Sequence, residues 1–150
     1  MKTLCIVSCG IKKIWDNIPN AEPTKSRNAY IVPFVKKCIE HAEKYFPNTW
    51  CILSAKYGFL FPEEIVEALY NVTFNDKSTK PISLYELSEQ ARKKSLNKFE
   101  TIIVLGGKKY VNIVKLVFQK HKIQFPLGEC RGIGFMMKKL NDSIQSGIPL

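Results

Sequence analysis

The chain has 150 residues, of which 45% are hydrophobic and 24% are charged, and its formal net charge is +10. These values predict one domain over residues 1–150 that can bury a core, and they exclude a disordered or low-complexity chain. The first apolar run is short and precedes lysines, and no run approaches membrane-spanning length. We therefore expect a cytoplasmic protein with no membrane contact, of an oligomeric state that the sequence does not define.

The first half of the chain predicts two strands joined by a helix. A strand is expected over residues 3–8, and a long loop with two prolines follows it. Apolar residues at four-residue spacing then predict a helix that begins near Arg27 or Pro33 and ends at Tyr45. A proline-asparagine pair breaks this pattern, and a second strand is expected over residues 49–53.

The middle of the chain is less regular. Residues 57–81 contain turn signals but no periodic pattern. Ser83 and Glu86 form a capping box, which predicts that a helix starts after Ser83. Its inward stripe is expected to consist of Leu84, Leu87, Ala91 and Ser95.

The last third of the chain predicts two strands and two helices. Residues 101–105 are almost all β-branched or leucine, which is typical of a strand covered on both faces. A helix over residues 108–120, a short strand near 123–125 and a last helix from 132 onward follow. This alternation indicates right-handed crossovers and an α/β fold, a three-layer α/β/α sandwich with a mostly parallel, Rossmann-like central sheet.

Three of the predicted strands end in a short turn that combines small residues with lysine. These turns cover residues 8–13, 54–58 and 106–110. In an open α/β sheet the carboxyl ends of parallel strands lie along one edge, and ligands bind there. If the three strands are parallel neighbours, their turns meet in one basic pocket.

The net positive charge favours a polyanionic partner, either a nucleotide or a nucleic acid. Much of this charge lies in pairs of basic residues on predicted helix faces. Such pairs could form either a solvated surface or a nucleic-acid footprint.

The five cysteines lack zinc-site spacing, and a disulfide framework is not expected. The sequence predicts neither a metal site nor a cofactor. Only Cys9 lies in a turn where a thiol could do chemistry, because adjacent cations and a helix N-terminus would favour its thiolate. The alternative is a small residue that fills a tight turn.

The second turn places Lys56 beside Tyr57 at a strand end. This pair could stabilise developing negative charge or donate protons, or it could be an exposed lysine next to a half-buried aromatic ring. Lys13 and Trp15 add a cation and an aromatic ring to the first turn. Trp15 could stack on a base or cover one end of the sheet.

The third turn contains Gly106 and Gly107 directly before a predicted helix. Glycines let the backbone approach a ligand, and the first N–H groups of the helix, with Lys108 or Lys109, could hold a phosphate. Simple turn chemistry explains the glycine pair equally well, because neither a GxGxxG nor a P-loop pattern is present.

Several motifs, taken in chain order, carry a resemblance to a known family. They are Val7-Ser8-Cys9-Gly10 with Lys13, Pro23-Thr24-Lys25, Ala29-Tyr30 with Pro33-Phe34, Leu53-Ser54-Ala55-Lys56-Tyr57-Gly58, and Tyr70-Asn71-Val72-Thr73-Phe74. In these motifs the chain resembles a family of small, largely uncharacterised bacterial and archaeal proteins that is distantly similar to the YaaA peroxide-stress proteins. YaaA-like proteins are associated with DNA binding and oxidative stress, so the resemblance implies nucleotide or nucleic-acid chemistry.

The chain departs from the pattern of that family at one acidic position. The family often has an acid before Ala-Tyr, where this chain has Asn28. If that acid is a catalytic base, this chain has lost it, and Glu22 and Glu129 remain as carboxylate candidates.

We predict an enzyme that acts on a nucleotide or a nucleic-acid base, with cleavage or exchange at an N-glycosidic bond as the leading reaction. The alternative is a noncatalytic DNA- or RNA-binding module of the YaaA-like type. The catalytic candidates are Cys9, Lys13, Lys56 and Tyr57. The substrate-binding candidates are Ser8, Gly10, Tyr30, Ser54, Gly58, Asn71, Gly106, Gly107 and Tyr110.

Overall fold

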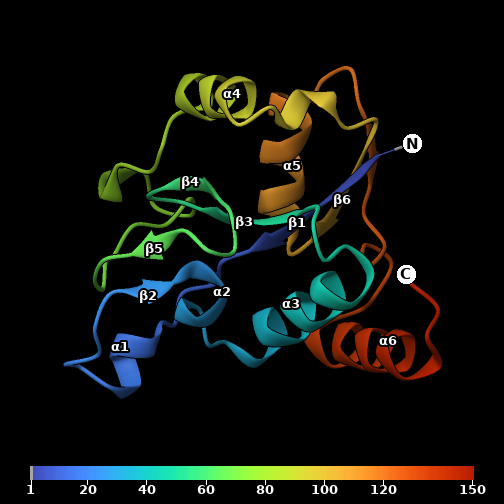
Figure 1. Cartoon of the computed structure of the whole chain (residues 1–150), viewed down its shortest axis with the longest axis horizontal. Helices are drawn as coiled ribbons and strands as arrows, with labels where there is room; N and C mark the ends of the chain where they lie inside the picture. The colour runs from blue at the N-terminus through green and yellow to red at the C-terminus, as the bar shows by residue number, and fades with distance from the viewer. Residues whose placement is uncertain (1) are drawn as a thin grey trace.

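A computed structural model describes residues 2–150 and contains a central five-stranded sheet (Figure 1). The strand order is β4-β3-β1-β6-β7, and β4 alone runs antiparallel to its neighbour. The strands are β1 (Thr3–Ser8), β3 (Trp50–Ser54), β4 (Gly58–Leu60), β6 (Thr101–Leu105) and β7 (Lys122–Gln124).

Two helices cover each face of this sheet, which confirms the predicted three-layer α/β/α sandwich (Figure 1). Alternate residues of a strand point to opposite faces. Accordingly, Cys5 and Val7 of β1 pack with the first pair of helices, whereas Leu4 and Ile6 pack with the second pair. The first pair is α3 (Pro33–Tyr45) and α6 (Ile133–Ser146), and the second pair is α4 (Leu84–Lys93) and α5 (Lys108–Val117).

The three strands with lysine-containing turns are parallel neighbours, as the predicted pocket requires. Strand β1 lies between β3 and β6. Its end is level with theirs, because Ser8 pairs with Leu53 of β3 and Val7 pairs with Leu105 of β6. The turns that follow β1, β3 and β6 therefore leave the sheet at one edge, which we call the carboxyl edge.

Short elements occupy the two segments that the sequence left without a pattern. The expected loop after β1 contains α1 (Ile14–Asn17), β2 (Thr24–Lys25) and α2 (Ser26–Ala29), and the segment after β4 contains β5 (Ile65–Val66). Strands β2 and β5 form a separate antiparallel pair. Elements of two to four residues are too short to show a helical or strand period, so a periodicity argument misses them. Two single-turn helices, at Lys77–Thr79 and Leu96–Lys98, complete the chain.

The predicted inward stripe of α4 is wrong at both ends. Leu87 and Ala91 are buried, but Leu84 is 43% exposed because it is the first residue of the helix. Ser95 lies beyond the end of the helix, in the left-handed conformation with φ 59°, and is exposed. The predicted N-cap is confirmed, since the Ser83 side chain accepts a hydrogen bond from the Glu86 N–H.

Within residues 2–150, no helix combines the length and the apolar character that a membrane span needs.

Candidate functional site

A cavity of about 480 Å³ opens at the carboxyl edge of the sheet. Its walls come from three segments: residues 9–16 after β1, residues 69–75 after β5, and Tyr110 in the first turn of α5. The segments are far apart in sequence, and the parallel order of β3, β1 and β6 brings them together. This position agrees with the general location of ligand sites in open α/β sheets.

Tyr70 is the residue that joins this cavity to the turn after β3. Its hydroxyl oxygen lies 2.6 Å from that of Tyr30 and 2.7 Å from Ser54 Oγ. Ser54 Oγ also accepts hydrogen bonds from the backbone N–H groups of Lys56 and Tyr57, at 3.2 and 3.1 Å. The hydroxyl groups of Ser54, Tyr70 and Tyr30 therefore form a continuous chain of hydrogen bonds.

Both phenols in this chain of hydroxyls are protonated at neutral pH. Burial raises the pKa of Tyr30 and the pKa of Tyr70. Tyr70 is therefore a fixed neutral residue whose ring, held by two hydrogen bonds, forms one wall of the cavity. The hydroxyl chain positions the site and does not supply a base.

Lys13 lines the cavity although it is almost completely buried, with 3% of its surface exposed. Its ammonium nitrogen lies 4.1 Å from the centre of the Tyr70 ring and donates a hydrogen bond to the Ile11 carbonyl at 2.8 Å. Burial lowers the pKa of Lys13, while nearby Cys9 and Asp16 oppose this shift. The electrostatic attraction to the Tyr70 ring stabilises the cation.

Lys56 and Tyr57 reach the same tyrosine from the turn after β3. The Lys56 ammonium nitrogen lies 5.5 Å from the centre of the Tyr70 ring, and the Tyr57 ring meets the Tyr70 ring edge-on at 5.4 Å. Neither residue forms part of the cavity wall, and Lys56 is exposed. The turns after β1 and β3 thus converge on Tyr70, with Lys13 inside the cavity and Lys56 outside its wall.

The predicted phosphate cradle in the third turn is not part of this cavity. Gly106 is buried, and a Cβ placed on it would lie 2.7 Å from Ser8 Cβ and 2.9 Å from Ser8 Oγ. The absence of a side chain at Gly106 lets β1 and β6 approach each other, so packing explains this glycine. Gly107 caps α5 and is exposed, and neither glycine lines the cavity.

Two further glycines among the candidates shape the turns. Gly10 lines the cavity with φ +72°, a conformation that favours glycine. Gly58 has φ +77° and lies outside the cavity wall, against the side chain of Gln90. Gln90 donates to the Tyr57 carbonyl at 2.8 Å and accepts from the Phe59 N–H at 2.9 Å, and so fixes the turn that carries Lys56.

The remaining substrate-binding candidates take different positions. Asn71 is exposed and lines the cavity, and Tyr110 lines it while its hydroxyl lies 3.4 Å from Cys9 Sγ. Ser8 and Ser54 are buried behind the wall, at the ends of β1 and β3. Tyr30 is also buried and acts through Tyr70.

Of the two alternatives for Cys9, the structure favours the small residue that fills a tight turn. Cys9 lies in the cavity wall but is only 3% exposed, and burial raises the pKa of its thiol despite the hydrogen bond with Tyr110 and the nearby Lys13 charge. The turn after β1 leads into a helix of only four residues, which is capped by Lys13. Cys9 is a neutral thiol that fills a tight turn.

The burial of the cysteines predicts a simple pattern of thiol reactivity. All five are free; Cys130 is partly exposed and the other four are buried, with pKa values raised by burial. We expect Ellman's reagent at pH 8 to modify one thiol per native chain rapidly, and Cys130→Ser to abolish this phase. Rapid modification of Cys9, located by mass spectrometry, would contradict the assignment.

Trp15 covers the end of the sheet and does not offer a face to a base. It is 6% exposed and belongs to the core next to α3. Its indole N–H donates to the Ala21 carbonyl at 2.7 Å. Of the two roles that the sequence left open for Trp15, the structure therefore selects the structural one.

Two important residues of the cavity wall were not among the predicted candidates. Asp16 lines the cavity, and its carboxylate accepts a hydrogen bond from the Lys13 backbone N–H at 2.8 Å. The three-residue spacing of Lys13 and Asp16 is a capping signal that could have revealed it. Tyr70 lay within a family motif, but nothing in its local sequence indicates that it contacts Ser54. The other carboxylate candidates, Glu22 and Glu129, are exposed and lie outside the wall.

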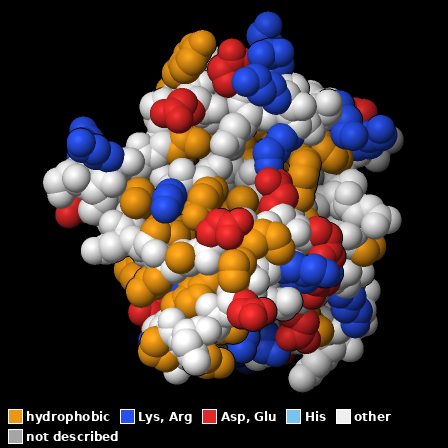
Figure 2. Space-filling view, turned by 60° about the vertical axis from the view of Figure 1, so that its left-hand side comes forward, with side chains coloured by type: hydrophobic (Ala, Val, Ile, Leu, Met, Phe, Trp, Pro, Cys, Tyr) orange, Lys and Arg blue, Asp and Glu red, His pale blue; other side chains and the backbone are white. Residues whose placement is uncertain are grey.

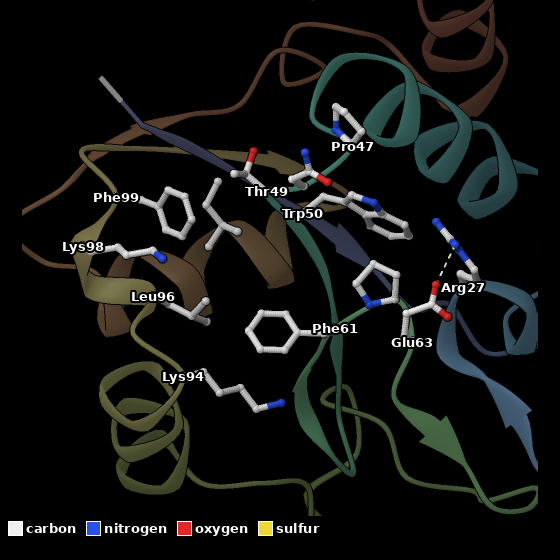
Figure 3. A pocket seen from close by; sticks show the side chains of 13 residues that line it. Arg27, Pro47, Thr49, Trp50, Phe61, Glu63, Lys94, Leu96, Lys98 and Phe99 are labelled. Atoms are coloured by element: carbon white, nitrogen blue, oxygen red, sulfur yellow. Dashed lines mark hydrogen bonds and ion pairs between the residues drawn. The ribbon is translucent and has the colours of Figure 1, made fainter.

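A second cavity, of about 500 Å³, lies at the opposite edge of the sheet (Figure 3). Its wall includes the cations Arg27, Lys94 and Lys98. Arg27 forms ion pairs with Glu43 and Glu63, and Lys94 pairs with Glu64. Because two of its three cations are already neutralised, this cavity is less suited to an anion than the cavity that contains Lys13.

The surface around the carboxyl edge does not form a continuous basic patch. Figure 2 turns the side of Figure 1 that holds this edge toward the viewer, and basic, acidic and hydrophobic side chains are interspersed there. Part of the net charge of +10 is also paired locally, as for Lys25 with Glu63 and Lys138 with Asp142.

Comparison with known proteins identifies the family of this chain. Residues 4–142 match the model of a "Family of unknown function (DUF6884)". The chain is 40% identical over 146 residues to the "Uncharacterized protein YfjM" of Bacillus subtilis (strain 168), and the match covers 97% of both chains. No solved structure is significantly similar to it. These findings confirm the predicted likeness to a family of uncharacterised proteins.

Proposed function

Because the chain belongs to DUF6884, a family of unknown function, we propose its function from the site: an enzyme that acts on a nucleotide or a nucleic-acid base at the N-glycosidic bond. The observation that carries this proposal is the cavity at the carboxyl edge, which combines one carboxylate, a buried cation and neutral polar side chains. Its volume of about 480 Å³ falls within the usual range for small-molecule sites.

The reaction makes specific demands on a site. Breaking a bond between sugar and base builds positive charge on the sugar and negative charge on the departing base, and water must attack the sugar carbon. A carboxylate can stabilise the positive charge that develops on the sugar, or it can accept a proton from the attacking water. Of the chain's 13 acidic residues, Asp16 alone lines the cavity. Asp16 therefore takes the role of the acid that the family pattern places before Ala-Tyr.

Other walls of the cavity suit a nucleobase. Asn71, Thr73 and Asn75 come from one segment and line it with amide and hydroxyl groups that can both donate and accept hydrogen bonds. The edge of a base presents the same mixture of donors and acceptors.

The test is the release of free base by the native protein and by Asp16→Asn. Nucleosides, nucleoside monophosphates and a short single-stranded DNA are incubated with each protein, and free base is measured by chromatography. We expect the native protein to release base from at least one substrate and Asp16→Asn to lose about 100-fold or more of that rate. The asparagine retains an oxygen that can accept the Lys13 N–H, so its unfolding temperature should change little.

The matched control is Asp142→Asn, on the exposed surface of α6, which should retain full activity. No base release from any of these substrates, or equal rates for the two variants, would contradict the proposed reaction.

A noncatalytic nucleic-acid-binding module is the second candidate. The net charge of +10 favours it, and so does the predicted likeness to YaaA proteins. Such a module depends on phosphate contacts, so its affinity for DNA falls steeply with salt concentration. A steep salt dependence without base release would favour this candidate, although the mixed charges of Figure 2 do not offer it a continuous basic face.

A further inference from the structure

We propose that Lys13 is the anchor for a phosphate group, so that the cavity takes a phosphorylated substrate and not a free base or an unphosphorylated nucleoside. For the nucleoside part of the substrate this inference rests on the proposed function. For the phosphate it rests on the surroundings of Lys13 alone.

The first observation is that Lys13 has unused hydrogen-bonding capacity. An ammonium group carries three N–H donors, and the Ile11 carbonyl takes one of them. Within residues 2–150, no carboxylate oxygen lies within 4.0 Å of its nitrogen. Burying a charge without a partner is costly, yet Lys13 is 3% exposed. An anion in the adjoining cavity would provide the missing partner.

The second observation is that a second cation is close. The nitrogens of Lys13 and Lys56 lie 4.1 and 5.5 Å from the centre of the same Tyr70 ring, so they are separated by no more than the sum of these distances. Lys56 is exposed and forms no ion pair among the described residues, so its flexible side chain can move toward an anion held by Lys13. Both charges raise the positive potential around Tyr70, which favours a dianion such as a phosphate monoester over a carboxylate.

The third observation is that the carboxylate of Asp16 already has a hydrogen-bond partner and that the Gly106 turn does not line the cavity. Asp16, the carboxylate in the wall, accepts a hydrogen bond from the backbone N–H of Lys13 rather than from its ammonium group. The Gly106 turn lies outside the cavity, against Ser8. The phosphate subsite is therefore expected at the turn after β1.

The test measures the binding of inorganic phosphate and of the four ribonucleoside 5′-monophosphates by titration calorimetry. Acetate and the corresponding nucleosides serve as the unphosphorylated probes. We expect the phosphorylated probes to bind the native protein, Lys13→Met to weaken this binding about tenfold or more, and Lys56→Gln to weaken it less. Lys115→Met, which changes an exposed lysine of α5, should bind them like the native protein.

A second measurement on the native chain covers the case in which Lys13→Met does not fold. In protein labelled with ¹³C-lysine, the ring of Tyr70 should displace the Lys13 side-chain resonance from the others, and inorganic phosphate should shift this resonance. The proposal would be overturned if acetate and phosphate bound equally well, or if Lys13→Met and Lys115→Met lost the same affinity. It would also be overturned if the Lys13 resonance did not shift when phosphate was added. Phosphate binding without base release would instead refute only the proposed reaction.

Discussion

Phe59→Ala is expected to lower the free energy of unfolding by about 3–5 kcal/mol, the range for truncating a buried phenylalanine. Phe59 is fully buried in the core between the sheet and helices α4 and α5, and its ring meets Phe118 edge-on at 5.8 Å. The substitution removes this contact and leaves a cavity that rigid strands and helices cannot fill. Chemical denaturation followed by circular dichroism measures the loss.

Phe61→Ala provides the matched control, because it truncates the next aromatic residue of the chain where the side chain is 37% exposed. We expect it to cost about 1 kcal/mol, since its ring is partly exposed and contacts Lys94 near the surface. Equal losses for Phe59→Ala and Phe61→Ala would contradict the packing described for β4.

Phe59 also matters for the candidate site. Strand β4 pairs with β3, so that Leu53 faces Phe59 and Ser54 faces Gly58. The turn between them carries Lys56 and is held from one side by this pairing. Loss of the Phe59 anchor should therefore loosen the position of Lys56 relative to Tyr70.

The parts of the fold that the sequence predicted well are the long, buried and periodic ones. Strands β1, β3 and β6 are continuous apolar runs, and helices α3 and α5 have one apolar face each, so their residues alone indicate both the elements and the parallel sheet. The parallel sheet in turn indicates the edge at which the turns after β1 and β3 converge.

The parts that the sequence could not predict depend on contacts between distant residues. Tyr70 belongs to the site because its hydroxyl meets Ser54 and Tyr30, and no local pattern encodes such a contact. Asp16 lies on a four-residue helix that is too short to show a period, so only its three-residue spacing from Lys13 could have indicated it. The pKa of Cys9 depends on burial, and the two lysines near it in sequence suggested the opposite shift.

Gly106 shows how the same residue supports two interpretations until its neighbours are known. A glycine between a strand and a helix is compatible with phosphate binding. The structure instead places Ser8 so close that a side chain at position 106 cannot fit without movement of β1 or β6. The two interpretations predict different results for substitutions at positions 106 and 107.

Gly106→Ala is expected to destabilise the protein by about 1–3 kcal/mol, the usual cost of overpacking a core, whereas Gly107→Ala should be nearly neutral. At position 107 no atom lies within 4 Å of an added Cβ. Thermal and chemical unfolding of both variants measure the difference. Ser8→Gly combined with Gly106→Ala should recover part of the loss, because it removes the two atoms that the new methyl group meets.

The same pair of variants separates packing from phosphate binding. If the phosphate lies at Lys13, Gly107→Ala should bind inorganic phosphate like the native protein, since position 107 lies outside the cavity. A backbone cradle in the third turn would show the reverse: Gly107→Ala would keep its stability and lose phosphate affinity, because an added methyl group would obstruct the approach of the anion to the first N–H groups of α5. That result would indicate that phosphate binds at the third turn. The buried charge of Lys13 would then be stabilised by the Tyr70 ring and the Ile11 carbonyl alone.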